Sequence, residues 1–167
     1  TGNLDRHIDL PSVNSQNGKW THVTIADFTG NGDHDLLLQA STEVRDWEGS
    51  TTPYYQPTIM AAFSYEELKN NGSSASALWW REDFVGLAHS VSIVADLTLD
   101  GKDEVIGTQI LRHDGSRSMS LGIDPGVLGH VDNLAIGDID PNRAGLECMA
   151  PREHYPYENI LFNTWGV

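Results

Sequence analysis

Three stretches of the chain carry oxygen-bearing side chains at regular spacing after an apolar segment. They are DFTGNGDHD from Asp27, DLTLDGKDE from Asp96 and DIDPNRAGLE from Asp138. In the first two, such side chains recur at every second position around a glycine that permits a sharp bend, which is how calcium loops gather oxygen ligands. The sequence therefore predicts calcium in these two turns. The predicted ligands are Asp27, Thr29, Asn31 and Asp35 in the first turn, and Asp96, Thr98, Asp100 and Glu104 in the second.

The third stretch offers Asp138, Asp140, Asn142 and Glu147, but it has one extra residue before the final acid and places Arg143 inside the turn. We therefore expect it to bind calcium less readily than the other two. A metal-free alternative applies to all three stretches, because Asp, Thr and Asn side chains also cap turns by hydrogen bonding to backbone amides.

A second group of candidates is histidines that precede the first predicted strand of each repeat, namely His22, His89 and His130. His130 and Asp132 are two residues apart, so on an extended chain both side chains leave the same face and can reach one cation or one substrate. The alternative is that each histidine hydrogen-bonds to a neighbouring strand. Glu153 and His154 follow a further predicted strand and add two more candidate ligands.

The elements that position these residues form an internal repeat. The anchoring aspartates lie 69 and 42 residues apart, and the shorter interval matches a β-propeller blade. The repeats are expected at about residues 20–85, 88–123 and 130–167, with an insert at 41–57 in the first. The predicted strands are 23–28, 35–40, 58–65 and 77–84, then 91–97, 104–111 and 118–123, then 133–139, 146–150 and 160–165. Only SYEELKN, from Ser64, is expected to form a helical turn.

The fold class predicted is therefore all-β, with about three β-propeller blades in one segment. Propellers usually close with four to eight blades, so three would leave sheet edges uncovered. We expect the remaining blades to come from the same polypeptide or from self-association of copies.

The net charge of the chain limits the classes of partner that it can bind. Ten basic and 24 acidic residues give a formal net charge of −14, which disfavours nucleic acid and anionic membranes because such a surface repels both. Cations are the natural partners. The chain has no apolar run of the roughly 20 residues that a membrane span needs, and its single cysteine, Cys148, permits no internal disulfide.

The stretch GHVDNLAIGDIDPNRAGLE, preceded by HSVSIVADLTLDGKDEVI, resembles the corresponding blades of propeller-type rhamnogalacturonan lyases. In that family a Gly-His-x-Asp turn is followed by Gly-Asp-x-Asp-Pro-x-Arg and Gly-Leu-Glu. The resemblance covers about Ala88 to His154. Val131 replaces a glycine and Ala135 stands where the family often has a second histidine, so propeller lyases acting on other uronic-acid polymers remain an alternative.

The resemblance implies a secreted multi-blade propeller with calcium ions that cleaves an acidic pectic polysaccharide by β-elimination. It places His89, His130, Asp132 and Glu153 near the metal or the substrate. A base must remove the proton beside the uronate carboxylate, while a bound cation neutralises that carboxylate. We assign catalytic roles to His89, His130 and Tyr55, substrate binding to Trp47, Tyr54 and Arg152, and additional metal binding to Asp132, Glu153 and His154.

Two other functions fit the same residues. One is a calcium-stabilised propeller module that binds carbohydrate or protein without catalysis, because fold alone does not determine function. The other is a structural segment whose catalytic groups lie on other blades. Formation of unsaturated product distinguishes the lyase from the binding module, whereas the rest of the polypeptide decides whether this segment is structural.

Overall fold

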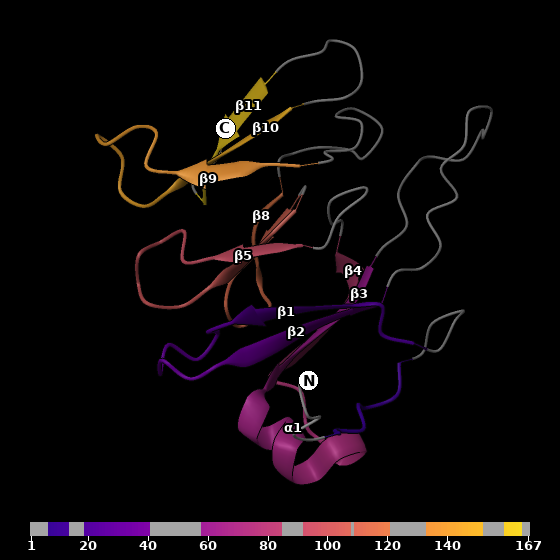
Figure 1. The fold of residues 1–167 in the computed structure, drawn as a ribbon. Helices are drawn as coiled ribbons and strands as arrows, with labels where there is room; N and C mark the ends of the chain where they lie inside the picture. Colours follow the sequence, from indigo (N-terminus) through magenta and orange to yellow (C-terminus); the bar gives the residue numbers. More distant parts are fainter. Residues whose placement is uncertain are drawn as a thin grey trace, which may run out of the picture.

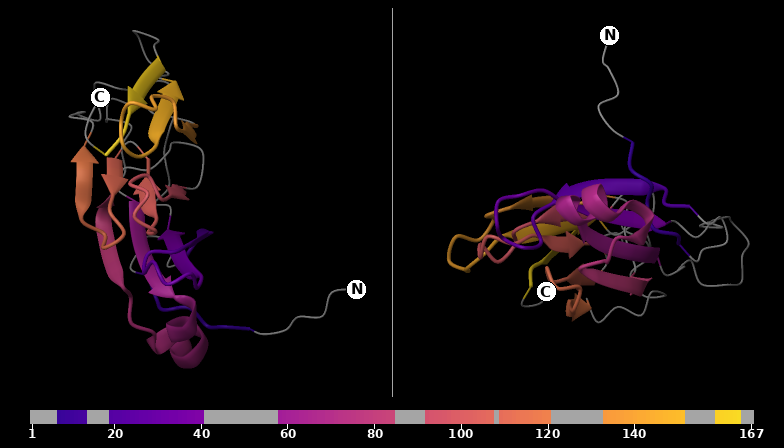
Figure 2. Two further views of the ribbon diagram at one scale, coloured as in Figure 1. Left: turned by 90° about the vertical axis from the view of Figure 1, so that its left-hand side faces the viewer. Right: turned by 90° about the horizontal axis from the view of Figure 1, so that it is seen from below.

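The computed structural model describes residues 7–13, 19–40, 58–84, 92–107, 109–120, 133–151 and 159–164. In these ranges the chain forms three small antiparallel sheets of four, four and three strands. The sheets follow one another in chain order, with α1 at one end of the row and β11 at the other (Figure 1, Figure 2). The all-β prediction is confirmed in this coarser form, and no closed ring is formed by the described residues.

The first sheet has its strands in sequence order, and the described α-helix connects its third and fourth strands. The Ser64 hydroxyl accepts a hydrogen bond from the Glu67 N–H, which caps the start of the helix, and Gly72, with φ of 53°, ends it. The predicted helical turn is thus confirmed. The elements are β1 (His22–Ala26), β2 (Asp35–Ala40), β3 (Thr58–Ser64), α1 (Tyr65–Asn71), the short 3-10 helix η1 (Gly72–Ser74) and β4 (Trp79–Phe84).

The second sheet corrects one prediction. The expected strand 104–111 is two strands, because the chain reverses near Gly107, whose N–H donates to the Gln109 carbonyl at 2.9 Å. Apolar residues on both sides of this reversal gave one continuous strand-like pattern. The sheet therefore has four strands: β5 (Ile93–Ala95), β6 (Glu104–Ile106), β7 (Gln109–Leu111) and β8 (Arg117–Ser120).

The third sheet has the order β11-β10-β9, as expected for three strands joined in sequence. Its strands are β9 (Ala135–Gly137), β10 (Glu147–Pro151) and β11 (Asn159–Phe162). No described helix in the chain is long and apolar enough to cross a membrane.

The core lies between the sheets, because successive residues of a strand face opposite sides. Val105 of β6 packs toward the first sheet with Phe28 and Leu37, whereas its neighbour Ile106 packs toward the third sheet with Phe162. The middle sheet is therefore buried on both faces. The single Cys148 is also buried in this core, as a free thiol.

The two ends of the sheets differ in the segments they carry. The turns 27–35, 96–104 and 138–147, called here the first, second and third Asp turns, all lie at one end, on the left in Figure 1. The opposite end, called the far end, holds the strand termini next to Ala40, Thr58, Phe84, Ser120 and Pro151. The predicted insert at 41–57 lies outside the described residues.

Candidate functional site

The predicted site residues divide into two groups. The eight predicted calcium ligands of the first two Asp turns are described by the structure. The residues assigned to catalysis, substrate and the other metal positions lie outside the described residues, and their assignments stay predictions: Trp47, Tyr54, Tyr55, His89, His130, Asp132, Arg152, Glu153 and His154.

In the first Asp turn the Asp27 carboxylate is surrounded by donors from its own turn. Oδ1 accepts from the N–H of Gly30 at 2.7 Å and of Asn31 at 3.2 Å, and from the Thr29 hydroxyl at 3.4 Å. Oδ2 accepts from the Gly32 N–H at 2.9 Å. Desolvation raises the pKa of Asp27, but these hydrogen bonds outweigh it and the pKa is lowered. Three of these donors bind Oδ1 and one binds Oδ2, so the Asp27 carboxylate is used mainly by its own turn.

The acids that close the turns, Asp35, Glu104 and Glu147, share one role and are called the terminal acids. Each is the first residue of the second strand of its sheet, and each side chain is buried. Each carboxylate accepts two backbone N–H groups from the start of its own turn. The distances are 2.9 and 3.0 Å from Phe28 and Thr29, 3.0 and 3.3 Å from Leu97 and Thr98, and 3.0 and 3.1 Å from Ile139 and Asp140.

Two terminal acids differ in electrostatics despite this shared role. Burial raises the pKa of Glu104 to about 7, with further repulsion from Asp100 and Asp96, although two backbone hydrogen bonds act against it. The pKa of Glu147 is lowered instead, because the N–H groups of Asp140 and Ile139 and the Asn163 side chain favour its charged form more than desolvation disfavours it. The second turn thus holds more uncompensated negative charge than the third.

The second Asp turn uses fewer of its acceptors than the first. Asp96 accepts from the N–H groups of Asp100 at 3.0 Å and Gly101 at 2.8 Å, and Asp100 accepts from the Lys102 N–H at 3.0 Å. Leu99 adopts a φ of 59°, the left-handed conformation that is uncommon for a residue with a side chain. Asp96 and Asp100 therefore keep acceptor positions that face solvent.

In the third Asp turn, Arg143 forms an ion pair with Asp140, a carboxylate that a cation would need as a ligand. Its Nε lies 3.3 Å from Asp140 Oδ2, and Asp140 Oδ1 accepts from the Asn142 N–H at 3.2 Å. This arrangement supplies positive charge and hydrogen bonds without a metal.

The fit of the Asp turns to calcium differs from turn to turn. Across the described ranges, no three or more His, Cys, Asp or Glu side chains are grouped so as to hold a metal ion. In the first turn most of the hydrogen bonds to Asp27 come from backbone donors of the same turn, and calcium there stays a prediction. The second turn has an all-oxygen donor set with open positions, which is the set calcium prefers. Calcium there stays a prediction.

Contacts between the sheets use residues that sequence reasoning missed. Asp103 Oδ2 accepts from the Asp27 N–H at 2.7 Å, and the Asp103 N–H donates to the Asp27 carbonyl at 2.9 Å. Toward the far end, Oε1 of the buried Gln39 accepts two hydrogen bonds from Ser92, one from the backbone N–H at 3.3 Å and one from the hydroxyl at 3.1 Å. The partners lie more than 50 positions apart, so no local pattern could reveal them.

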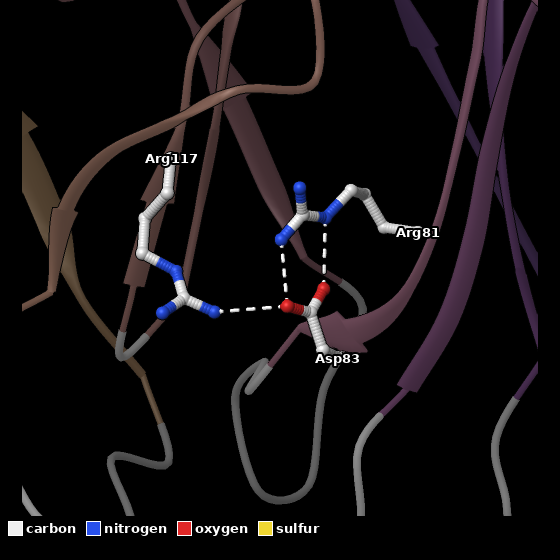
Figure 3. Close-up of polar contacts among 3 residues, drawn as sticks. All are labelled: Arg81, Asp83 and Arg117. Carbon is white, nitrogen blue, oxygen red and sulfur yellow. Dashed lines mark hydrogen bonds and ion pairs between the residues drawn. The ribbon is translucent and has the colours of Figure 1, made fainter.

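An exposed ion cluster also joins the first two sheets (Figure 3). Arg81 of β4 binds Asp83 through Nε at 2.8 Å and Nη2 at 2.7 Å. Arg117 of β8 reaches the same carboxylate at 3.1 Å. The cluster bridges neighbouring sheets, and with Asp83 56% exposed its contribution to stability is small.

Of the repeated histidines, His22 is the described one. It lies within β1 at the far end rather than before the strand, it is exposed, and its Nδ1 is 2.9 Å from the Thr21 hydroxyl. Its contact is thus with the adjacent residue.

Comparison with known proteins agrees with the resemblance in the motifs. The family model for the rhamnogalacturonan lyase family 11 C-terminal domain matches residues 50–161. The rhamnogalacturonan endolyase YesW of Bacillus subtilis is 36% identical over 111 residues, which are 62% of this chain and 16% of that protein. The exolyase YesX of the same organism is 36% identical over 125 residues, 68% of this chain and 20% of that protein.

Solved structures give the same relationship. The crystal structure of YesW is 27% identical with a TM-score of 0.60, covering 85% of this chain and 22% of that one. A Bacillus licheniformis rhamnogalacturonan lyase is 25% identical with a TM-score of 0.60 and equal coverage. The chain thus spans about a fifth of the length of these relatives. It belongs to rhamnogalacturonan lyase family 11, as part of the C-terminal domain of that family.

Proposed function

We propose that the whole protein is a polysaccharide lyase that cleaves an acidic, pectin-like polysaccharide by β-elimination. The observation that carries this proposal is the family match over residues 50–161. Of the two curated relatives, one is named an endolyase and the other an exolyase of rhamnogalacturonan, so kinship leaves both cleavage patterns open. The proposal includes an extracellular location, because a polysaccharide does not cross a membrane unaided.

The topology supports a single functional end. The predicted residues Tyr55, His89, His130, Asp132 and Glu153 belong, in sequence, to segments that join strand termini at the far end. Loops at one end of a rigid set of sheets are a common place for binding and catalytic groups. The far end is therefore where we propose that the substrate is bound.

At that end, His89 is proposed as the base that removes the proton beside the uronate carboxylate. The electron pair left behind forms the carbon–carbon double bond as the glycosidic oxygen departs, and Tyr55 or His130 returns a proton to that oxygen. A bound calcium would neutralise the uronate carboxylate as charge builds, with Asp132, Glu153 and His154 as its proposed ligands.

The Asp turns have a different proposed role, because they lie at the end of the sheets opposite to the proposed substrate site. Calcium in the second Asp turn would compensate the repulsion among Asp96, Asp100 and Glu104. It would stabilise the fold and take no part in the elimination.

The test is the ultraviolet absorbance of unsaturated product when the full-length protein is incubated with rhamnogalacturonan. His130→Ala and His89→Ala are expected to abolish turnover without changing the melting temperature, and added calcium should not restore it. His113→Ala is the matched control, since His113 lies on the β7–β8 turn beside Lys102, away from the far end, and should leave turnover unchanged. Near-normal turnover in both far-end variants would refute the assigned roles.

A binding module without catalysis is the second candidate, because a fold shared with enzymes does not by itself establish catalysis. Affinity for the polymer with no unsaturated product from the full-length protein would support it.

A further inference from the structure

The ion cluster of Arg81, Asp83 and Arg117 lies where the edge strands of two sheets come together (Figure 3). β4 and β8 are each the last strand of their sheet, and among the described residues neither pairs with a further strand. Arg81 and Asp83 are two residues apart on β4, so both side chains leave the same face, and Arg117 reaches Asp83 from β8. The side chains of Arg81 and Arg117 are 27% and 39% exposed, so both are within reach of a ligand from solvent.

The cluster holds more positive than negative charge. Two guanidiniums share one carboxylate, which leaves an excess of positive charge in a chain whose formal net charge is −14. Elsewhere in the described chain, Arg143 is matched by one acid, Asp140. Lys69 is likewise matched by Glu66. Most of this protein repels a polyanion, so a local excess of positive charge is where a polyanion makes contact.

Asp83 holds both guanidiniums without using all of their donors. It takes two N–H groups from Arg81, at 2.8 and 2.7 Å, and one from Arg117, at 3.1 Å. A guanidinium carries more N–H donors than these, and in Figure 3 the other terminal nitrogen of each points away from Asp83. The two guanidiniums are thus oriented by one acid and keep donors for another, and their planar shape matches the two oxygens of a carboxylate.

Stabilisation of the contact between sheets does not account for this arrangement. Exposed ion pairs contribute little to stability. Backbone hydrogen bonds already join neighbouring sheets, because the Asp103 N–H donates to the Asp27 carbonyl at 2.9 Å. The Leu146 N–H donates in the same way to the Leu97 carbonyl at 2.8 Å. A second arginine on one exposed carboxylate therefore adds binding capacity more than it adds stability.

We propose that Arg81 and Arg117 form a second binding site for the acidic polysaccharide. A uronate carboxylate accepts N–H groups from both guanidiniums, and Asp83 holds them in position. The inference rests on the proposed function for its substrate class, because the uronates of a pectin-like polymer supply the carboxylates. The site lies on edge strands, outside the segments at the far end to which the proposed catalytic residues belong. A polymer held at both places gains avidity without a new contact at the reacting atoms.

Binding of the full-length protein to immobilised polygalacturonate tests the site. Arg81→Gln with Arg117→Gln should weaken binding about 10-fold, because two charged donors are lost. The matched control, Lys69→Gln with Arg143→Gln, removes the same charge from pairs away from β4 and β8 and should change the affinity less than about twofold. Both double variants should keep the melting temperature of the unsubstituted protein, because all four side chains belong to exposed pairs. Equal losses of affinity in the two variants, or no binding by the unsubstituted protein, would overturn the proposal.

Carboxyl-reduced polygalacturonate, in which the uronates are neutral sugars, tests the class of ligand. The unsubstituted protein and the variant with both Arg81→Gln and Arg117→Gln should bind it equally, and a difference of about 10-fold that persisted on this polymer would overturn carboxylate recognition. Polyglutamate is the other comparison. A loss of affinity for polyglutamate with none for polygalacturonate would identify an acidic protein as the partner and overturn the proposal.

The measurement separates this site from the proposed function, because binding is read without turnover. If the full-length protein forms no unsaturated product but the loss of affinity is seen, the lyase is refuted and the carboxylate site stands. If product forms and the two double variants bind polygalacturonate equally, the site is refuted and the lyase stands.

Discussion

Replacing Glu104 with glutamine should stabilise the protein at pH 8. Glu104 is 1% exposed, and its pKa of about 7 means that burial and the nearby Asp100 and Asp96 disfavour its charged form. Glutamine retains a carbonyl oxygen to accept the N–H groups of Leu97 and Thr98. The substitution therefore removes the charge and keeps the acceptor.

The sign of the pH dependence follows from the direction of the pKa. Between the unfolded value of 4.5 and the folded value of about 7, the native state binds more protons than the unfolded state. Glu104 therefore lowers the free energy of unfolding as pH rises through this window, by at most about 3 kcal/mol. Asp100 is exposed, so water screens part of the repulsion, and we expect about 1–2 kcal/mol.

Denaturant unfolding at pH 5 and pH 8, with chelator present, measures this difference. The unsubstituted protein should lose stability between the two values, and Glu104→Gln should lose less and be more stable at pH 8. Glu147→Gln is the matched control at the same position of the third turn. The pKa of Glu147 is lowered, so its charge stabilises the fold above its unfolded pKa, and its removal should destabilise at pH 8. Effects of the same sign in both variants would refute the reasoning.

Three further predictions concern the Asp turns. Gly30→Ala should lower the free energy of unfolding by about 1–3 kcal/mol, because the φ of Gly30 is +71° and the added Cβ would meet Lys102. Gly32→Ala is the control and should cost less, because Gly32 also has a positive φ but has open space around it. Equal losses in denaturant unfolding would contradict the close approach of Gly30 to Lys102. Chelation should lower the melting temperature of the unsubstituted protein more than that of Asp96→Asn, which lacks the second-turn site. An unchanged melting temperature in both would leave the hydrogen-bonded turns without metal. Asp140→Ala should reduce stability, because the turn loses the hydrogen bonds that this carboxylate accepts, and lost turnover at unchanged stability would argue against a structural role.

Much of the fold is predictable from local pattern. Strand β2 has the predicted bounds, Asp35–Ala40, because a turn with two glycines precedes it and apolar residues fill it. The sequence did not predict the division of 104–111 into β6 and β7, because the apolar pairs Val105–Ile106 and Ile110–Leu111 are separated by three residues only, 107–109. A strand buried on both faces gives a continuous apolar run instead of an alternating one.

The candidate site is predictable in its residues but not in their partners. The spacing of Asp27, Asp96 and Glu104 identified oxygen-rich turns correctly, yet whether the carboxylates face a cation or backbone N–H groups depends on three-dimensional geometry. The contribution of Asp103 depends on Asp27, 76 positions away, which no local period reports. The assignments at His89 and His130 lie outside the described residues and stay predictions.

The order of strands within each sheet has a consequence for synthesis of the protein. All three sheets are meanders whose neighbouring strands are consecutive in the chain, so each needs only local loop closures to form. A sheet can therefore assemble as it leaves the ribosome, before the next has been translated. The backbone contacts at Asp103 and Leu146 then join each new sheet to the one before it. Folding in this order limits the time during which the two-sided apolar middle sheet is exposed to other chains.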